Sequence, residues 1–326
     1  MNPALSYNVY ARRKGGMKVI RGLRNLKRPA EGSVVTIGVF DGVHKGHEAI
    51  IKRTVERAKS LGLKSMVVTF DPHPLKVVHP SPYVPSLISL DHRLRLIERL
   101  GVDITVIVKF TRSVARLSPE AFVGDLLARR LGSREIYVGE NFYFGKGAGA
   151  SAPALKKLAG RYRIKAHIVA PIIVEDRVVS SSVIRGLLAI GELARAARFL
   201  GRPVSILGTV VRGSRMGRML GYPTANINPH HEAIPASGVY AVRVLFQDRE
   251  LKGIVNIGVR PTFIRRGASE AEPRIEAHIF DFRKKIYGED LEIIFVRKLR
   301  DERPFASKAE LAAQIAKDER KARRIL

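Results

Sequence analysis

Two histidines stand three residues apart in the segment G-V-F-D-G-V-H-K-G-H-E, residues 38–48. The apolar run 34–40 predicts a strand, and the residues from about His47 to Ser60 have a helical pattern. Both side chains can then face one pocket at a helix start, where free N–H groups and the helix dipole favour an anion. Because that dipole disfavours imidazolium, we expect neutral histidines that donate N–H bonds, with Gly46 leaving room for a phosphate. Two surface histidines in a loop are the alternative, which the strand–turn–helix context and the glycines argue against.

A second polar group follows a glycine-rich basic loop, G-T-V-V-R-G-S-R-M-G-R-M-L-G at 208–221. Such a loop can wrap phosphates through its backbone N–H groups. Pro223-Thr224-Ala225-Asn226 comes next and places a hydroxyl and an amide oxygen on one side of an extended segment. Both are hard oxygen ligands that suit a magnesium ion which keeps waters and phosphates. A flexible basic loop with a polar turn is the alternative.

A lone carboxylate lies in the segment R-I-E-A-H-I-F-D-F, residues 274–282. Alternation places Glu276, His278 and Phe280 on one face of a predicted strand. A carboxylate inside a barrel strand is costly unless it has partners or a task. One such task is that of a general base that takes a proton from a primary alcohol. A paired structural glutamate is the alternative.

The N-terminal half alternates predicted strands with predicted helices. Strands are predicted at 34–40, 65–70, 104–110, 136–139 and 164–170, and helices at 47–60, at 90–100 and from Ser118-Pro119-Glu120 onward. This alternation predicts a parallel sheet with helices on both faces. Ligands of such sheets bind at the carboxyl ends of the strands.

The pattern changes after Gly201-Arg202-Pro203. Strands are predicted at 204–211, 238–246, 251–257, 274–282 and 291–299, followed by a helix at 307–323. This order predicts an antiparallel barrel with one C-terminal helix. We therefore expect two domains, residues 1–185 and 186–326, with the boundary near 185–202.

Composition excludes several classes of protein. The chain has 326 residues, which suits two domains, and it has no cysteine. A disulfide scaffold, a zinc–thiolate site, an iron–sulfur cluster and a cysteine nucleophile are thereby excluded. No segment has the length and apolarity of a membrane span, and the N-terminus lacks the apolar core of a signal peptide. We expect a soluble, cytoplasmic protein.

The net charge of +28 is unusual. Residues 1–185 hold 32 basic residues and 186–326 hold 26, while residues 1–30 hold eight and no acidic one. Nucleic-acid binding, small phosphorylated ligands and a generally basic surface all fit this charge. Basic termini on a generally basic chain favour non-specific polyanion binding, but they do not make it the function.

The first motif set resembles known enzymes. His44-Lys45-Gly46-His47 matches the His-x-Gly-His signature of the nucleotidyltransferase superfamily, whose histidines stabilise the transition state of attack on the α-phosphate of a nucleoside triphosphate. With F-D-P-H-P at 70–74, V-G-E-N-F-Y-F-G-K-G at 138–147 and V-S-S-S-V-I-R at 179–185, the half resembles the adenylyltransferase module of prokaryotic FAD synthetases. That family usually has Ser-Ser-Thr at 180–182. The resemblance implies catalytic His44 and His47, ATP or phosphate contacts from Gly38, Phe40, Asp41, Gly46, Ser181, Ser182 and Arg185, and flavin contacts from Phe70, His73 and Asn141.

The second motif set resembles the riboflavin kinase module. It adds P-x-x-G-V-Y at 235–240, N-I-G-V-R-P-T-F at 256–263 and I-Y-G at 286–288 to the P-T-A-N and E-A-H-I-F-D-F segments. The resemblance implies that Thr224 and Asn226 bind magnesium–ATP and that Glu276 is the catalytic base. Ala277 stands where the family more often has a larger aliphatic. The implied ATP loop holds Gly208, Gly213, Arg215, Gly217 and Gly221.

Together the modules imply a bifunctional riboflavin kinase and FMN adenylyltransferase. Its fold would be a Rossmann-like nucleotidyltransferase domain followed by an antiparallel β-barrel with a terminal helix. Riboflavin, FMN and FAD would be substrates and products, and ATP with Mg²⁺ would be the phosphate donor. We expect no specific nucleic acid and no membrane as a partner. The oligomeric state does not follow from the residues.

Two alternatives come from other classes. A nucleic-acid-binding protein could use an old nucleotidyltransferase scaffold, and a relative could keep one reaction or use another phosphorylated acceptor. Gly145–Ala150 also fits the dinucleotide fingerprint G-x-G-x-x-A, but it does not close a first strand and no acidic residue follows at the required distance. No G-x-x-x-x-G-K-[ST] loop is present, so ATP is not held by a loop of that type.

Overall fold

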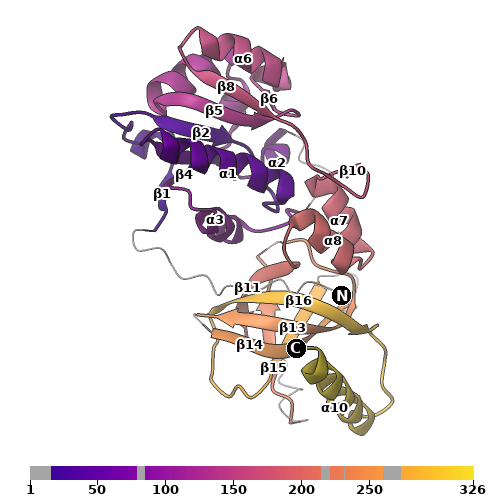
Figure 1. The fold of residues 1–326 in the computed structure, drawn as a ribbon. Helices are drawn as coiled ribbons and strands as arrows, with labels where there is room; N and C mark the ends of the chain where they lie inside the picture. Colours follow the sequence, from indigo (N-terminus) through magenta and orange to yellow (C-terminus); the bar gives the residue numbers. More distant parts are fainter. Residues whose placement is uncertain (1–15, 79–84, 214–220, 231, 248, 260–272) are drawn as a thin grey trace. The chain divides into compact units, whose positions relative to one another are not determined.

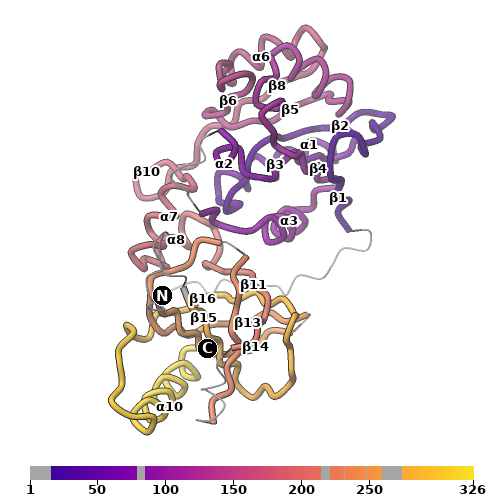
Figure 2. Tube along the Cα trace, turned by 180° about the vertical axis from the view of Figure 1, so that it is seen from behind, coloured from indigo at the N-terminus to yellow at the C-terminus, as the bar shows by residue number. Residues whose placement is uncertain are grey.

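The computed structural model describes residues 16–78, 85–213, 221–230, 232–247, 249–259 and 273–326. It contains two compact units (Figures 1 and 2). The described residues up to 86 and residues 90–181 form one unit. Residues 87–89 and those from 182 onward belong to the other.

The first unit is built on a six-stranded sheet in the order β1-β4-β3-β2-β5-β8. Every pair of neighbours in it is parallel. The strands are β1 Lys18–Arg21, β2 Ser33–Ile37, β3 Lys64–Asp71, β4 Ile104–Lys109, β5 Ser133–Gly139 and β8 Lys165–Val169. The five predicted strands and the parallel sheet are confirmed, whereas the edge strand β1 was not predicted.

Helices bury both faces of this sheet, as parallel sheets require. Helix α1, Lys45–Ser60, contacts β2, β3 and β5 and buries Ile51 completely. The opposite side chains, such as Val35 and Val106, form a core with the π-helix η2, Phe122–Arg130, and with α6, Ala152–Gly160. Helix α3, Leu90–Arg99, is a further long helix of this unit.

Short elements connect these layers. They are η1 Leu23–Asn25, α2 Pro74–Val78, α4 Arg112–Ala115, α5 Pro119–Ala121, β6 Tyr143–Phe144, η3 Lys146–Ala148, β7 Ala150–Ser151, β9 Ile173–Val174 and β10 Arg177–Val178. Ser118 caps α5 as predicted, because its Oγ accepts from the N–H of Ala121 at 3.1 Å. The G-x-G-x-x-A segment lies in the β6–β7 hairpin, so it does not form the strand-to-helix turn of a dinucleotide site.

The second unit contains a closed antiparallel barrel in the order β11-β12-β15-β14-β13-β16. Its strands are β11 Ser205–Val211, β12 Ala225–Asn228, β13 Gly238–Phe246, β14 Arg249–Val259, β15 Pro273–Ile279 and β16 Asp290–Arg300. Helices α7 Ser181–Ala189 and α8 Leu193–Leu200 precede it, and α10 Lys308–Ile325 follows. The predicted barrel and terminal helix are confirmed, and β12 is the strand that the sequence pattern did not show.

A short segment from the first half of the sequence packs within the second unit. Leu87 and Ile88 are 4% and 3% exposed, and the N–H of Ser89 donates to Glu232 Oε1 at 2.8 Å. The other oxygen of Glu232 accepts from the N–H of Leu207 in β11 at 3.0 Å. A fragment that begins at residue 186 would therefore lack part of the barrel unit's packing.

An ion pair fixes α1 on the sheet. Arg57, near the end of α1, donates to both carboxylate oxygens of Glu135 in β5, with Nη2 to Oε1 at 2.7 Å. The ring of His167 in β8 lies 2.9 Å from Glu135 Oε2. The hydrogen bond from Arg57 is the main reason that the pKa of the Glu135 carboxyl is held below its ordinary value.

We expect Glu135→Gln to lower the free energy of unfolding by about 1–3 kcal/mol near pH 7, because it removes charged hydrogen bonds from a buried carboxylate. Glu135 has a lowered pKa in the fold, so its contribution is complete above the unfolded value of about 4.3 and is lost as the pH falls through the folded value. Urea unfolding of both proteins from pH 7 to pH 3.5 measures this. A difference that does not shrink toward low pH would contradict the assignment.

Candidate active sites

The two histidines of the first motif meet at the start of α1. His44 is the N-cap residue, and its Nδ1 accepts from the N–H of His47 at 3.4 Å. The two rings stack, with centroids 3.6 Å apart. An accepting Nδ1 carries no proton, so a neutral His44 holds its proton on Nε2 and can donate there. The sequence prediction that both side chains share the helix start is met by this geometry.

The turn before the histidines is conformationally strained. Phe40, Gly42 and Val43 have φ values of 53°, 85° and 39°, and the two non-glycine residues among them rarely adopt such values. Phe40 is 2% exposed, and its ring meets the His47 ring edge-on at 5.3 Å. A Cβ on Gly38 would lie 3.0 Å from the Phe40 ring. Gly38 and Phe40 thus pack against each other within the turn, and the Phe40 ring supports the His47 ring.

Gly46 lies next to the His44 ring. A Cβ at this position would lie 3.3 Å from two atoms of the His44 ring. The absence of a side chain therefore makes room for the histidine ring itself. Room for a phosphate at the Gly46 backbone stays a prediction.

The serine segment reaches the same turn. Ser181 Oγ donates to the backbone oxygen of Asp41 at 2.9 Å, and Asp41 is 2% exposed. The backbone oxygen of Val179 lies 3.9 Å from the Cβ position of Gly46. Ser182 and Arg185 follow in the first turns of α7, where Ser182 is exposed and Arg185 is half-buried.

The sheet order places three other predicted residues at the carboxyl ends of strands next to the histidine turn. From β2 the chain proceeds to β3 and β4 on one side and returns to β5 on the other, so a topological switch point lies between β2 and β5. Phe70 is the next-to-last residue of β3, and His73 follows the strand with its Nδ1 accepting from the N–H of Leu75 at 3.1 Å. Asn141 follows β5 and is exposed. The histidine turn thus lies between the two predicted flavin segments.

The second site is a row of side chains across the barrel. Asn226 in β12 pairs directly with Glu276 in β15, which pairs with Asn256 in β14. Directly paired residues of antiparallel strands share one face. The adjacent residues Ile275 and Ala277 are each 1% exposed and form the barrel interior. The row therefore lies on the outer face.

Glu276 is paired with an arginine of its own strand β15. Arg274 Nη2 donates to Glu276 Oε1 at 2.6 Å. Asn256 Nδ2 donates to Glu302 Oε1 at 3.3 Å. The Glu276 side chain is 23% exposed, so the burial cost that the sequence argument assumed is smaller. Arg274 was missed although it lies two residues from Glu276 on the same strand, whereas the positions of Asn256 and Glu302 depend on strand register and on the segment after β16.

Two glycines of the predicted ATP loop leave no space for a side chain. A Cβ on Gly213 would collide with the Asn226 side chain, and one on Gly208 would collide with the backbone oxygen of Asn228. Gly221 has a φ of 83°. Arg215 and Gly217 lie outside the described residues.

The P-T-A-N segment is held by β15. The His278 ring nitrogen Nδ1 lies 2.9 Å from the backbone oxygen of Pro223, so it donates to that oxygen. Tyr222 also meets the His278 ring edge-on at 5.4 Å. Thr224 is half-buried immediately before β12. Within the described ranges, no three His, Cys, Asp or Glu side chains converge on a possible metal position.

Known proteins share this combination. Family models described as FAD synthetase and riboflavin kinase match residues 26–183 and 200–326. The bifunctional riboflavin kinase/FMN adenylyltransferase of Escherichia coli (strain K12) is 38% identical over 94% of this chain and 97% of its own length. That of Pseudomonas fluorescens is 35% identical over 93% and 96%. This chain belongs to the bifunctional riboflavin kinase/FMN adenylyltransferase family. The family predicted from the motifs is confirmed.

A solved structure shares the whole fold. The crystal structure of a macrolide-efflux protein from Streptococcus pneumoniae matches with a TM-score of 0.81 and 30% identity over 94% of this chain and 99% of that chain. In the part of this chain that the structure describes, no helix has the length and apolarity needed to cross a membrane.

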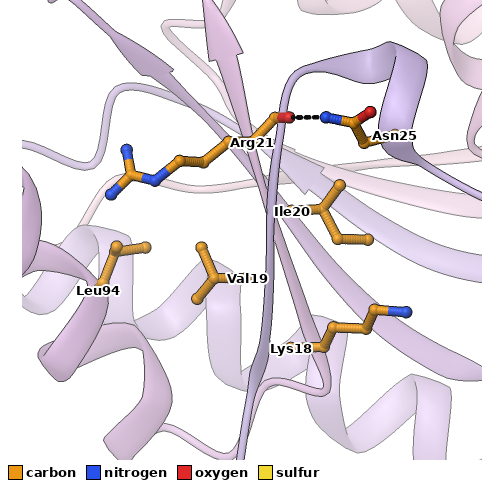
Figure 3. A pocket seen from close by; sticks show the side chains of 6 residues that line it. All are labelled: Lys18, Val19, Ile20, Arg21, Asn25 and Leu94. Atoms are coloured by element: carbon orange, nitrogen blue, oxygen red, sulfur yellow. Dashed lines mark hydrogen bonds between the residues drawn. The ribbon is translucent and has the colours of Figure 1, made fainter.

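A hollow of about 620 Å³ lies beside the edge strand β1 (Figure 3). Lys18, Arg21 and Asn25 contribute polar atoms to it, and Leu94 of α3 lines it. The Asn25 amide donates to the Arg21 backbone oxygen at 2.8 Å. None of the predicted site residues lines this hollow, so its size does not identify a reaction site.

We expect His44→Ala to lower the free energy of unfolding by about 1 kcal/mol, because it removes the cap of α1. His44→Asn keeps a side-chain acceptor and should recover most of that loss. Chemical denaturation of the three proteins measures the effect. Equal stability of wild type and His44→Ala would contradict a capping role.

Proposed function

We propose that the barrel phosphorylates riboflavin at the Glu276 face and that the sheet unit adenylylates FMN at the histidine turn. The chain's family carries both activities in its name, and each family model covers one of the two motif sets. The observation that carries the proposal is the direct pairing of Asn226 with Glu276. These two residues, expected to be a metal ligand and a base, come from separate motifs and share one face.

In the kinase reaction, Glu276 accepts the proton of the riboflavin 5′-hydroxyl as that oxygen attacks the γ-phosphorus of ATP, and ADP leaves. Arg274 holds Oε1 of this carboxylate, which leaves Oε2 to face the hydroxyl. Asn226 and Thr224 supply oxygen ligands of the kind that Mg²⁺ accepts alongside phosphate oxygens and waters. A bound Mg²⁺ would offset the negative charge of the triphosphate.

In the second reaction, a phosphate oxygen of FMN attacks the α-phosphorus of ATP, and pyrophosphate leaves. The attacking group is already an anion, so no general base is needed. His44 and His47 donate N–H bonds to the oxygens on which charge develops, and the start of α1 adds its N–H groups and dipole. Gly38, Phe40, Asp41 and Ser181 hold this turn in place.

The two reactions are assigned to residues 1–185 and 186–326. The remaining predicted contacts of Ser182, Arg185, Phe70, His73 and Asn141 with ATP or flavin belong to this proposal. Both reactions consume ATP, which supports a cytoplasmic location. The test is incubation with riboflavin, ATP and Mg²⁺, followed by chromatographic separation of riboflavin, FMN and FAD; absence of FMN and FAD would overturn it.

His47→Ala should lower FAD formation from supplied FMN by at least about 10²-fold, the cost of a lost transition-state donor. Riboflavin phosphorylation by the same preparation should stay within about twofold of wild type, because the barrel residues are unchanged. His167→Ala serves as the control, since that histidine belongs to the Glu135 ion cluster. An equal loss of both reactions would identify His47 as structural.

Glu276→Gln should lower riboflavin phosphorylation by about 10²–10⁴-fold, because the amide keeps the shape but cannot accept the proton. FAD formation from supplied FMN should continue. The measurement is paired on one preparation, with initial rates of both reactions and ATP affinity by calorimetry.

Glu250→Gln is the matched control for Glu276→Gln, because Glu250 is also an arginine-paired glutamate on a barrel strand, with Arg243 Nη1 3.3 Å from its Oε1. Its rates should equal those of wild type. Normal phosphorylation by Glu276→Gln would remove this carboxylate from the mechanism, and loss of both reactions would indicate misfolding.

A further inference from the structure

Helix α3 buries an arginine that the two reactions do not require as a substrate contact. Leu94 of this helix lines the hollow at β1, whereas Arg93 is 3% exposed. Burying a guanidinium is costly, and replacing a buried ion by an apolar residue is often neutral or stabilising. The position of Arg93 therefore calls for a reason other than stability.

The guanidinium contacts the end of β3. Its Nη1 donates to Thr69 Oγ1 at 2.9 Å and to the Phe70 backbone oxygen at 3.2 Å. Thr69 is fully buried, and its Oγ1 donates in turn to the Val39 backbone oxygen at 3.0 Å. Val39 immediately precedes Phe40 in the strained turn. One guanidinium thus connects the start of the F-D-P-H-P segment to the turn that carries the histidines.

The charges near Arg93 belong to the same two segments. Burial lowers the pKa of its guanidinium, while the negative charges of Asp41 and Asp71 oppose that shift. Asp41 lies in the histidine turn and Asp71 ends β3. Arg93 Nε is buried and has no hydrogen-bond partner among the described residues. The negative charges of Asp41 and Asp71 therefore favour the cation, and the Phe70 backbone oxygen accepts one of its hydrogen bonds.

We propose that Arg93 is a positioning residue for adenylyl transfer, which fixes the Phe70–His73 segment relative to the His44–His47 turn through Thr69. This inference rests on the proposed function, because the two segments are the expected flavin and triphosphate sides of that reaction. Arg93 itself is too buried to touch a substrate. Its effect falls on the alignment of the attacking phosphate with the α-phosphorus, to which in-line transfer is sensitive.

The test uses the full chain and two pairs of variants. Arg93→Met removes the charge and the donors, whereas Arg93→Lys keeps the charge but cannot hold both loops as a fork does. Thr69→Val removes the bridging hydroxyl at nearly constant shape, whereas Thr69→Ser keeps it. Ile97→Val is the control, because Ile97 is a fully buried residue of the same helix.

Rates of FAD formation from FMN and of FMN formation from riboflavin are measured on each preparation, with kcat and KM separated. We expect Arg93→Met and Thr69→Val to lower kcat for FAD formation by about 10–100-fold. Thr69→Ser and Ile97→Val should stay within about threefold, and FMN formation should be unchanged throughout. In the Arg93→Lys/Thr69→Val double variant, kcat for FAD formation should fall no further than in the more impaired of the two single variants. The reason is that both changes break the same connection.

Several outcomes would overturn the proposal. These are normal FAD formation by Arg93→Met, equal losses in Thr69→Val and Thr69→Ser, or independent losses that add in the double variant. If Arg93→Met fails to fold and loses both reactions, the Thr69 pair decides. A wild-type protein that forms no FAD would instead refute the proposed function, so the two failures are distinguishable.

Discussion

Repulsion between phosphate groups is the constraint on which both sites depend. Each reaction brings an oxygen nucleophile to a triphosphate, and in the second reaction the nucleophile is itself an anion. Neither site meets this with a cluster of acidic metal ligands among the described residues. In the proposed adenylyl transfer, the sheet unit offers the N-terminal backbone and dipole of α1. In the proposed phosphorylation, the barrel offers Gly208 and Gly213, where a side chain would collide with β12, and the uncharged oxygens of Thr224 and Asn226.

Backbone geometry decides where the reactive side chains lie. The stacking of His44 on His47 accompanies the N-cap hydrogen bond between these two residues, which lie three apart at the first turn of α1. In the barrel, the pairing of Asn226 with Glu276 follows from register, and a shift by one residue would send Glu276 into the interior. Each site is therefore as rigid as the element that carries it. The loops that complete the sites have to be held separately, as Arg93 does for one pair of them.

Periodicity and motifs predicted most of the fold, because long apolar strands and capped helices leave strong local signals. The four residues of β12 and the exposed strand β1 were missed, since neither is long and apolar. The hydrogen bond between Asn256 and Glu302 was missed for another reason. It joins β14 to the segment after β16, and no local pattern encodes such a contact. Arg93 was missed because an arginine on a helix is ordinarily exposed, and its burial depends on contacts with β3.

In this basic chain, buried carboxylates join separate elements of the fold. Among the described residues, the buried charged side chains are five carboxylates and Arg93; the carboxylates are Asp41, Glu135, Glu232, Glu292 and Asp318. Several of these join separate elements.

Glu135 joins α1 to β5, Glu232 joins residues 87–89 to β11, and Asp318 of α10 accepts from Arg300 Nε of β16 at 2.9 Å. Carboxylates placed inside leave the surface more basic than the composition suggests. Arg93 is the buried cation among the described residues, and it lies where the segments that carry Asp41 and Asp71 meet beside the proposed adenylyl-transfer site.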